Sequence, residues 1–283
     1  MKTILPLLLY FFCLVISCTE TTTGEPANNI TDQQKDSISS ENDVWPMVKS
    51  VSWNVGITHK LEFFYNPDSS LNYYLSGSSN LPSKYKTQFI FKNRKLDEAV
   101  FENTSVSRFL YNDSGKVKEL KNINNGVETS RRSYIYDPEG RIQHLESEVL
   151  MHGVLTTTWE SSFNYDAEGN IIKTTTINYD ENGEALDTIQ RNIQQTSPPL
   201  DLNPYSLLHP LYQHQAQEIF DLVVLNQIKK LPVKISESGR SSTGPINYKY
   251  FYTISDKLLM KVKCRIAIGN NPAYDTAEAL FQY

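Results

Sequence analysis

The sequence predicts a mostly β protein: an antiparallel meander of hairpins curled into an open barrel-like sheet, with one helical insertion near residues 205–226. One short turn phrase recurs along the chain and places a Tyr six residues before an apolar residue. Between these turns apolar and polar residues alternate, as they do in half-buried antiparallel strands. Near residue 205 the alternation gives way to apolar residues at helical spacing, which predicts the insertion.

The first 17 residues have the plan of a secretory signal peptide, since Lys2 precedes an apolar run that ends at Ile16. That run is shorter than the roughly 20 residues needed to span a bilayer as a helix. The order Val-Ile-Ser-Cys at positions 15–18 resembles the bacterial lipoprotein box, in which the cysteine becomes lipidated. We therefore expect lipidation of Cys18 and a lipid-anchored protein of the cell envelope, at the outer membrane. An ordinary secreted protein with a chance cysteine is the alternative.

Residues 18–43 contain no aromatic residue, and Ile30 and Ile38 are their only large aliphatic residues. Such a segment cannot bury enough surface to offset the entropy of ordering. It predicts a flexible tether in front of one antiparallel β domain at 44–283.

Loss of residues 1–17 would leave 26 Lys and Arg residues against 32 Asp and Glu residues, a net charge of −6. This acidic balance disfavours a nucleic-acid partner. The same cleavage removes one of the three cysteines, and lipidation would take Cys18. Cys264 would then stand alone, without a disulfide framework, and its place in the apolar phase of a strand predicts a buried side chain.

The turn phrase has the chemistry of a hairpin tip. Asp or Asn follows the Tyr in five of its six copies, and Gly takes the fourth turn position in four. A type I turn followed by a left-handed residue favours these residue types, so each copy predicts a hairpin. The six copies begin at Tyr65, Tyr111, Tyr136, Tyr165, Tyr179 and Tyr252.

The register of one hairpin predicts a candidate binding face. If Asp166 lies opposite Asn170, then Trp159 pairs with Ile177 on a mostly apolar face. The opposite face would be exposed and polar, and its hydroxyl, amide and carboxylate groups suit sugar hydroxyls. A solvated Thr-rich β face is the alternative. The six candidate ligand-binding residues are Thr158, Glu160, Ser162, Thr174, Thr176 and Asn178.

The helical insertion carries apolar residues that lie three, four or seven positions apart. This spacing predicts a helix over 205–224 that covers one end or face of the sheet. The residues that set the spacing are Leu208, Leu211, Tyr212, Ile219, Phe220, Val223 and Val224.

No catalytic or metal-binding signature stands out. The sequence has no His-Glu-x-x-His motif, no Gly-x-Ser-x-Gly motif and no paired-cysteine metal site. His209 and His214 are poorly spaced for a shared metal on a helix. The turn residues Asp137, Asp166 and Asp180 lack the alternate-position oxygens of a calcium loop, so we expect them to bond their own turn backbones. We expect no enzyme activity, no cofactor and no metal.

Four features occur together in an order that resembles a family of bacterial lipoproteins with a domain of unknown function of porin-like fold. They are the Tyr-Asp-x-x-Gly hairpins, TTTWESSFNYDAEGNI at 156–171, LDLNPYSLL at 200–208 and IKKLPVKI at 228–235. More loosely, the hairpins are similar to the Tyr-Asp repeats of secreted Rhs-type proteins, although the copies here are few and irregularly spaced. The resemblance covers about residues 45–283. It implies an antiparallel, barrel-like meander and supplies no catalytic residues to transfer.

These observations favour a non-enzymatic, lipid-anchored envelope protein that binds a glycan or another envelope protein through its polar sheet face or its loops. Its membrane contact would be the N-terminal lipid. The alternative is a carrier, because a sheet curled over the helix of residues 205–224 could enclose a lipid or another hydrophobic molecule.

Overall fold

The computed structural model describes residues 46–283 except 55, 103, 208–215 and 241–243. The predicted signal peptide, the predicted tether, Cys18, His209 and His214 lie outside the described residues. The β domain is therefore described by itself.

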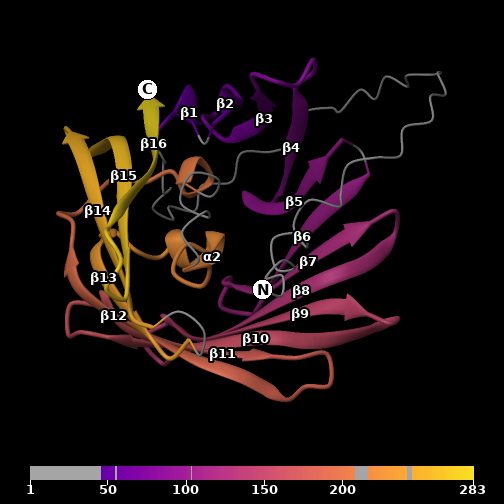
Figure 1. Ribbon diagram of the computed structural model, residues 1–283. Coiled ribbons are helices and arrows are strands. Elements are labelled where there is room, and N and C mark those ends of the chain that lie inside the picture. The colour runs from indigo at the N-terminus through magenta and orange to yellow at the C-terminus, as the bar shows by residue number, and fades with distance from the viewer. Residues whose placement is uncertain (1–45, 55, 103, 208–215, 241–243) are drawn as a thin grey trace. The chain divides into compact units, whose positions relative to one another are not determined.

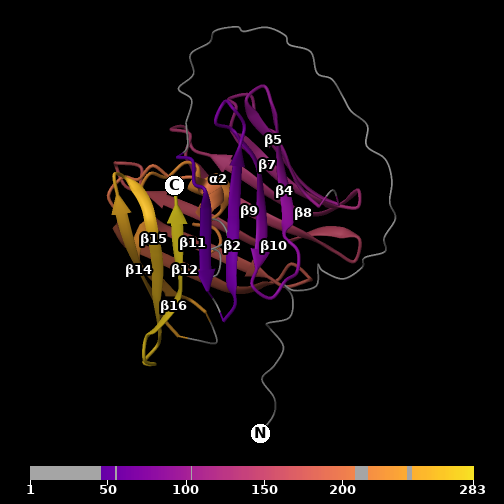
Figure 2. The same cartoon turned by 90° about the horizontal axis from the view of Figure 1, so that it is seen from above.

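The described chain folds into a closed antiparallel barrel of sixteen strands, in which each strand pairs with its neighbours in the sequence and β1 pairs with β16. Figures 1 and 2 show the last strands, in yellow, beside the first, in indigo. The strands are β1 Ser50–Asn54, β2 Thr58–Tyr65, β3 Leu71–Ser78, β4 Tyr85–Lys92, β5 Lys95–Phe101, β6 Ser105–Tyr111, β7 Val117–Asn124, β8 Val127–Tyr136, β9 Ile142–Met151, β10 Val154–Tyr165, β11 Ile171–Tyr179, β12 Ala185–Thr196, β13 Pro232–Ser238, β14 Ile246–Ser255, β15 Leu258–Ile268 and β16 Tyr274–Gln282. The predicted mostly β, barrel-like meander is confirmed, and it differs from the expected open sheet in that the first and last strands close it.

The recurring tyrosines gather at one end of the barrel. Because neighbouring strands are antiparallel, all even-numbered strands end at the same rim, which we call the tyrosine rim. There, six tyrosine hydroxyls donate to a backbone carbonyl of the preceding strand or just before it, at 2.6–3.0 Å. The donors are Tyr65, Tyr111, Tyr136, Tyr165, Tyr252 and Tyr283. In five of its six copies, the tyrosine of the phrase thus fastens a turn to the strand beside it.

The predicted turn chemistry is confirmed in detail. Asp166 accepts hydrogen bonds from the backbone N–H groups of Glu168 and Asn170, at 3.0 and 2.8 Å. Asp137 and Asp180 accept equivalent bonds within their own turns. Gly169 has a φ of 83°, the left-handed conformation that the turn requires.

Two copies of the phrase differ from the expectation. Tyr179 ends an odd-numbered strand, β11, so its turn lies at the end opposite the tyrosine rim. Tyr252 pairs with Val262, and its hairpin turns through Asp256 and Lys257, both with positive φ.

The predicted register of β10 and β11 is wrong below the turn. Tyr165 does pair with Ile171, but a bulge between Asn164 and Tyr165 shifts every pair that follows, so that Trp159 lies opposite Asn178. A shift of one residue exchanges the two faces of one strand relative to the other. A similar shift in the β8–β9 hairpin places Arg132 opposite Ser147.

Residues 197–231, here called the plug, connect β12 to β13 at the tyrosine rim, and those of them that the structure describes pack inside the ring of strands (Figure 1). Phe220 of the plug contacts Tyr250 of β14, with ring centroids 5.6 Å apart, and Tyr205 contacts Phe89 of β4. The insertion is thus confirmed. The predicted long helix is not, because the described part holds only a helical turn at 204–207 and α2, Leu222–Leu225. Asp221 ends any longer helix by capping the first turn of α2.

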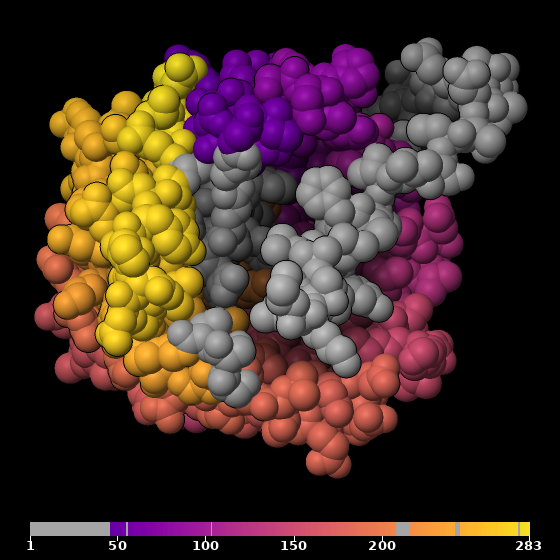
Figure 3. All heavy atoms as spheres, in the orientation of Figure 1, coloured from indigo at the N-terminus to yellow at the C-terminus, as the bar shows by residue number. Residues whose placement is uncertain are grey.

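The apolar core lies between the plug and the inward side chains of the strands, and Cys264 is buried in it as expected. Away from the plug, the inward side chains of neighbouring strands are polar. Ser107 donates to Asn122 at 2.7 Å, and Asn122 donates to Ser130 at 2.8 Å. On the face shown in Figure 3, the strands encircle a hollow.

The outer wall carries charged residues in cross-strand ion pairs. Examples are Arg108 with Glu98, Lys261 with Glu278, and Arg265 with Asp275. No helix among the described residues is long and apolar enough to cross a membrane.

Candidate functional site

The six predicted ligand-binding residues do not form one patch, because the register shift divides them between the two sides of the wall. Thr174 and Thr176 point inward and are buried. Thr174 donates to Glu218 of the plug at 2.8 Å, and Thr176 bonds Ser161 at 2.7 Å. They cannot contact a ligand on the outer face, so that part of the predicted geometry is wrong.

The other four residues are partly or fully accessible to solvent. Asn178 shares the inward phase of β11 and donates to Asp187 at 2.6 Å. Thr158 sits at a bulge of β10, and its hydroxyl donates to the carbonyl of Ser147. Glu160 and Ser162 point outward, as predicted. Of these outward side chains, Glu160 lines a pocket.

The buried threonines belong to a charged cluster that the sequence analysis missed. Arg191 of β12 donates to Glu218 of the plug at 2.6 Å and to Glu237 of β13 at 2.7 Å, and all three side chains are buried. Burial acts to lower the pKa of Arg191, but the two carboxylates outweigh it and raise that pKa above its ordinary value. This cluster fastens the plug to the wall.

A second buried contact fastens the plug to the opposite part of the wall. Asp221 accepts hydrogen bonds from Arg132 at 2.7 Å and from Tyr134 at 3.2 Å, while its Oδ1 also caps α2. Burial and the Asp221 charge raise the pKa of Tyr134 well above its ordinary value. Both clusters have a structural role, because their polar atoms form hydrogen bonds with one another inside the protein.

The outer pocket lies around Glu160, at the end of the barrel opposite the tyrosine rim, and has a volume of about 420 Å³. Glu160 of β10 lies directly opposite Glu146 of β9, so two carboxylates share its floor. The pocket is lined by Glu146, Leu155, Thr156, Thr157, Glu160, Tyr179 and Gly183.

Each carboxylate of the outer pocket has one hydroxyl partner and further capacity to accept. Glu160 Oε1 accepts from the Tyr179 hydroxyl at 2.8 Å, and this bond raises the pKa of Tyr179. Glu160 Oε2 lies 3.6 Å from His144 Nε2. Glu146 accepts from Thr157 at 2.7 Å. A carboxylate offers about four lone-pair sites, so both groups can accept further hydrogen bonds.

Glu160 was among the predicted ligand-binding residues, but the residues that share the pocket with it were not predicted. Glu146 and Thr157 come into the pocket through the true register of β9 with β10, which the bulge at Thr158 sets. Tyr179 reaches it because its turn lies at the far rim. Tyr179 could have been assigned to this end of the barrel because it closes an odd-numbered strand, and odd-numbered strands end at the rim opposite the other tyrosines of the phrase.

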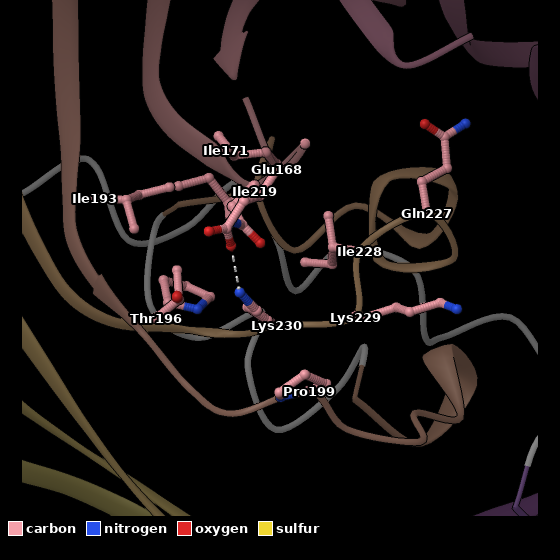
Figure 4. Close-up of a pocket in the computed structure, with 13 residues that line it drawn as sticks. Glu168, Ile171, Ile193, Thr196, Pro199, Ile219, Gln227, Ile228, Lys229 and Lys230 are labelled. Atoms are coloured by element: carbon pink, nitrogen blue, oxygen red, sulfur yellow. Dashed lines mark hydrogen bonds and ion pairs between the residues drawn. The ribbon is translucent and has the colours of Figure 1, made fainter. Parts of the chain in front are cut away.

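A second pocket, shown in Figure 4, lies at the tyrosine rim between the plug and the wall and has a volume of about 290 Å³. Within the described residues, no group of three or more His, Cys, Asp and Glu side chains is placed to hold a metal ion.

No protein-family model matches the sequence, and no curated protein matches it. The fold is similar to that of a porin-like protein from Bacteroides uniformis, with a TM-score of 0.55 at 11% identity, over 84% of this chain and 98% of that one. A porin-like protein from Bacteroides vulgatus gives a TM-score of 0.47 at 13% identity, over 83% and 98% of the two chains. At such identity the first likeness shows a shared porin-like barrel fold.

Proposed function

We propose that this protein is a non-enzymatic, lipid-anchored binding protein of the cell envelope, and that its outer pocket binds a neutral glycan. The observation that carries the proposal is the pair of opposed carboxylates, Glu146 and Glu160, beside the ring of Tyr179 in one surface pocket. Carboxylates accept hydrogen bonds from sugar hydroxyls, and a tyrosine ring offers a flat apolar face to the sugar ring.

A neutral glycan fits the local charge better than an acidic one. The two carboxylates would repel an anionic polymer, whereas sugar hydroxyls can donate to both. His144, at 3.6 Å from Glu160, and Thr157 extend the polar rim of the site. Hydrogen bonds to charged groups contribute about 1.5–3 kcal/mol, so a few of them support a specific site.

The ion pairs on the outer wall support anchoring through a lipid. A barrel that crosses a bilayer carries an outward apolar band, and a charged side chain in that band costs about 2–4 kcal/mol. The ion pairs of Arg108 with Glu98 and of Arg265 with Asp275 suit a wall in water. Membrane contact is then supplied by a lipid on Cys18.

Glycan binding is tested by titrating envelope-derived neutral oligosaccharides into the protein and into Glu160→Gln and Tyr179→Phe variants. Glu160→Gln should weaken binding at least fivefold, because it removes one charge-assisted acceptor. Glu139→Gln is the matched control, since Glu139 is exposed at the opposite rim. Equal affinities in all four proteins would contradict the site. Release of new reducing ends from the bound glycan would contradict the non-enzymatic role.

Lipid anchoring is tested separately with Cys18→Ser. The variant should leave the membrane fraction while its β domain keeps the melting temperature of the parent. Unchanged partitioning into detergent would contradict the anchor and leave the glycan site untouched.

A further inference from the structure

The pocket at the tyrosine rim is built from the wall on one side and the plug on the other. The β10–β11 turn, the first residue of β11, the end of β12 and the first residue of β13 supply the wall, and the plug supplies the rest (Figure 4). Tyr165 fixes the wall side, because its hydroxyl donates to the carbonyl of Ile142 at 2.6 Å. The pocket is therefore a formed feature of the rim.

Six of the thirteen residues that line this pocket are aliphatic. Ile219, which is fully buried, contributes from the plug, and none of the thirteen lining residues is aromatic. A sugar or a nucleobase would lack a flat ring to stack on, whereas a hydrocarbon chain would meet branched aliphatic groups. The aliphatic lining residues are Ile171, Ile193, Pro199, Ile219, Ile228 and Pro232.

The charged residues of the lining carry a net positive charge. Lys230 forms an ion pair of 2.9 Å with Glu168, whose side chain is 73% exposed, and Figure 4 shows this pair beside the isoleucines. Lys229 also lines the pocket, is exposed, and has no carboxylate within ion-pair distance among the described residues. In Figure 4 the Lys230 side chain reaches toward the isoleucines and the Lys229 side chain points away from them, so Lys230 is the direct partner for an anionic head group and Lys229 adds positive charge to the surroundings. Glu168 can turn into solvent when another carboxylate takes its place on Lys230.

We propose that this pocket binds a medium-chain fatty acid, with its chain against the isoleucines and its carboxylate at Lys230 in place of Glu168, while Lys229 supplies a second positive charge nearby. A volume of about 290 Å³ lies at the lower end of the roughly 300–1,000 Å³ of small-molecule pockets, which suits a chain of medium length. The site is separate from the outer pocket around Glu160 and does not depend on glycan binding there.

The affinity of the pocket should depend on the length of the fatty-acid chain. Each methylene group removed from water tightens binding about fourfold until the pocket is full. Octanoate should therefore bind about sixteenfold more tightly than hexanoate. The neutral alcohol octanol, with the same chain, should bind more weakly than octanoate because it cannot pair with the lysines.

The experiment uses the mature chain with Cys18→Ser, so that no acyl chain of its own competes, and measures hexanoate, octanoate, octanol and octylamine by calorimetry. Ile228→Asn should weaken octanoate binding at least tenfold, and Lys229→Gln about threefold. Ile172→Asn and Lys234→Gln are the matched controls, since both residues are exposed and outside the lining. Each should leave the affinity unchanged.

Absence of saturable octanoate binding to the parent would overturn the proposal. So would octanoate binding that survives both Ile228→Asn and Lys229→Gln, or octylamine binding more tightly than octanoate. Because Lys229 is exposed, its variant reports on binding even where Ile228→Asn perturbs the plug.

Discussion

Arg191 of β12 and Glu218 of the plug form a 2.6 Å hydrogen-bonded ion pair inside the barrel, and both side chains are almost fully shielded from solvent. Glu237 completes the cluster on the other side of the guanidinium. A buried pair is a weak source of net stability, but removing one partner leaves an uncompensated buried charge. The plug therefore depends on the whole cluster.

We expect Arg191→Ala to lower the free energy of unfolding by about 3–5 kcal/mol, because two carboxylates would stay buried without their counter-charge. Arg108→Ala, which removes an exposed ion pair with Glu98, should cost less than about 1 kcal/mol. Urea unfolding of both variants checks this. Similar losses in the two would show that the Arg191 cluster does not hold the plug.

Removing the hydroxyl of one tyrosine at the tyrosine rim should lower the stability of the protein by a similar amount at each position. Tyr165→Phe keeps the ring but removes the hydroxyl that donates to Ile142, and should cost about 0.5–1.5 kcal/mol. Tyr136→Phe should cost a similar amount, since Tyr136 donates to Val117 in the same way. Tyr274→Phe is the control, because Tyr274 is half exposed on β16. Thermal unfolding that ranks the control with the other two would refute the rim bonds.

Two glycines should respond differently to alanine. Gly169 has a φ of 83° and nothing within 4 Å of an added Cβ, so Gly169→Ala should cost about 1 kcal/mol for conformation alone. Gly239 has a φ of 102°, and a Cβ there would run into the backbone carbonyl of Thr188. Gly239→Ala should therefore be clearly more destabilising. Melting temperatures that fall equally would contradict this ranking.

The rim also predicts an alkaline limit of stability. Burial raises the pKa of four rim tyrosines to about 12, from about 10 in the unfolded chain. A raised pKa gives stability that is complete below pH 10 and is lost as the pH rises toward 12. Unfolding should therefore accompany the appearance of tyrosinate absorbance in this window. Unfolding well below pH 10 would show that groups other than these tyrosines cause the loss of stability. The four residues are Tyr65, Tyr111, Tyr136 and Tyr283.

The hairpins could be predicted because turn chemistry is local. Asp166 and Gly169 carry their requirements within five residues, and the turn has the expected bonds and left-handed glycine. The register below that turn could not be predicted, because the bulge at Asn164 leaves no mark in the apolar and polar alternation. A one-residue slip then exchanged the two faces of β11.

The candidate site could be predicted only in part, for a related reason. A Thr-rich strand face has the same sequence pattern whether water or a buried ion cluster satisfies its hydroxyls. Thr174 donates a hydrogen bond to Glu218. Because Glu218 lies 44 residues away in a segment with no β pattern, nothing near Thr174 in the sequence indicates that Thr174 is buried. Glu160 was placed correctly because its outward phase does not depend on β11. Predicting its partner Glu146 would have required the register of the β9–β10 hairpin.

The closure of the barrel has a kinetic consequence. All other strand pairs join consecutive strands, and all of these except β12 with β13, which the plug separates, are hairpins of a kind that forms within microseconds. The seam between β1 and β16 joins residues 232 positions apart, as in the bond from Ser50 to Gln282. Contacts so distant form late, because the entropy of closing the loop precedes any gain from pairing. The rate of ring closure should therefore limit how fast the whole barrel folds.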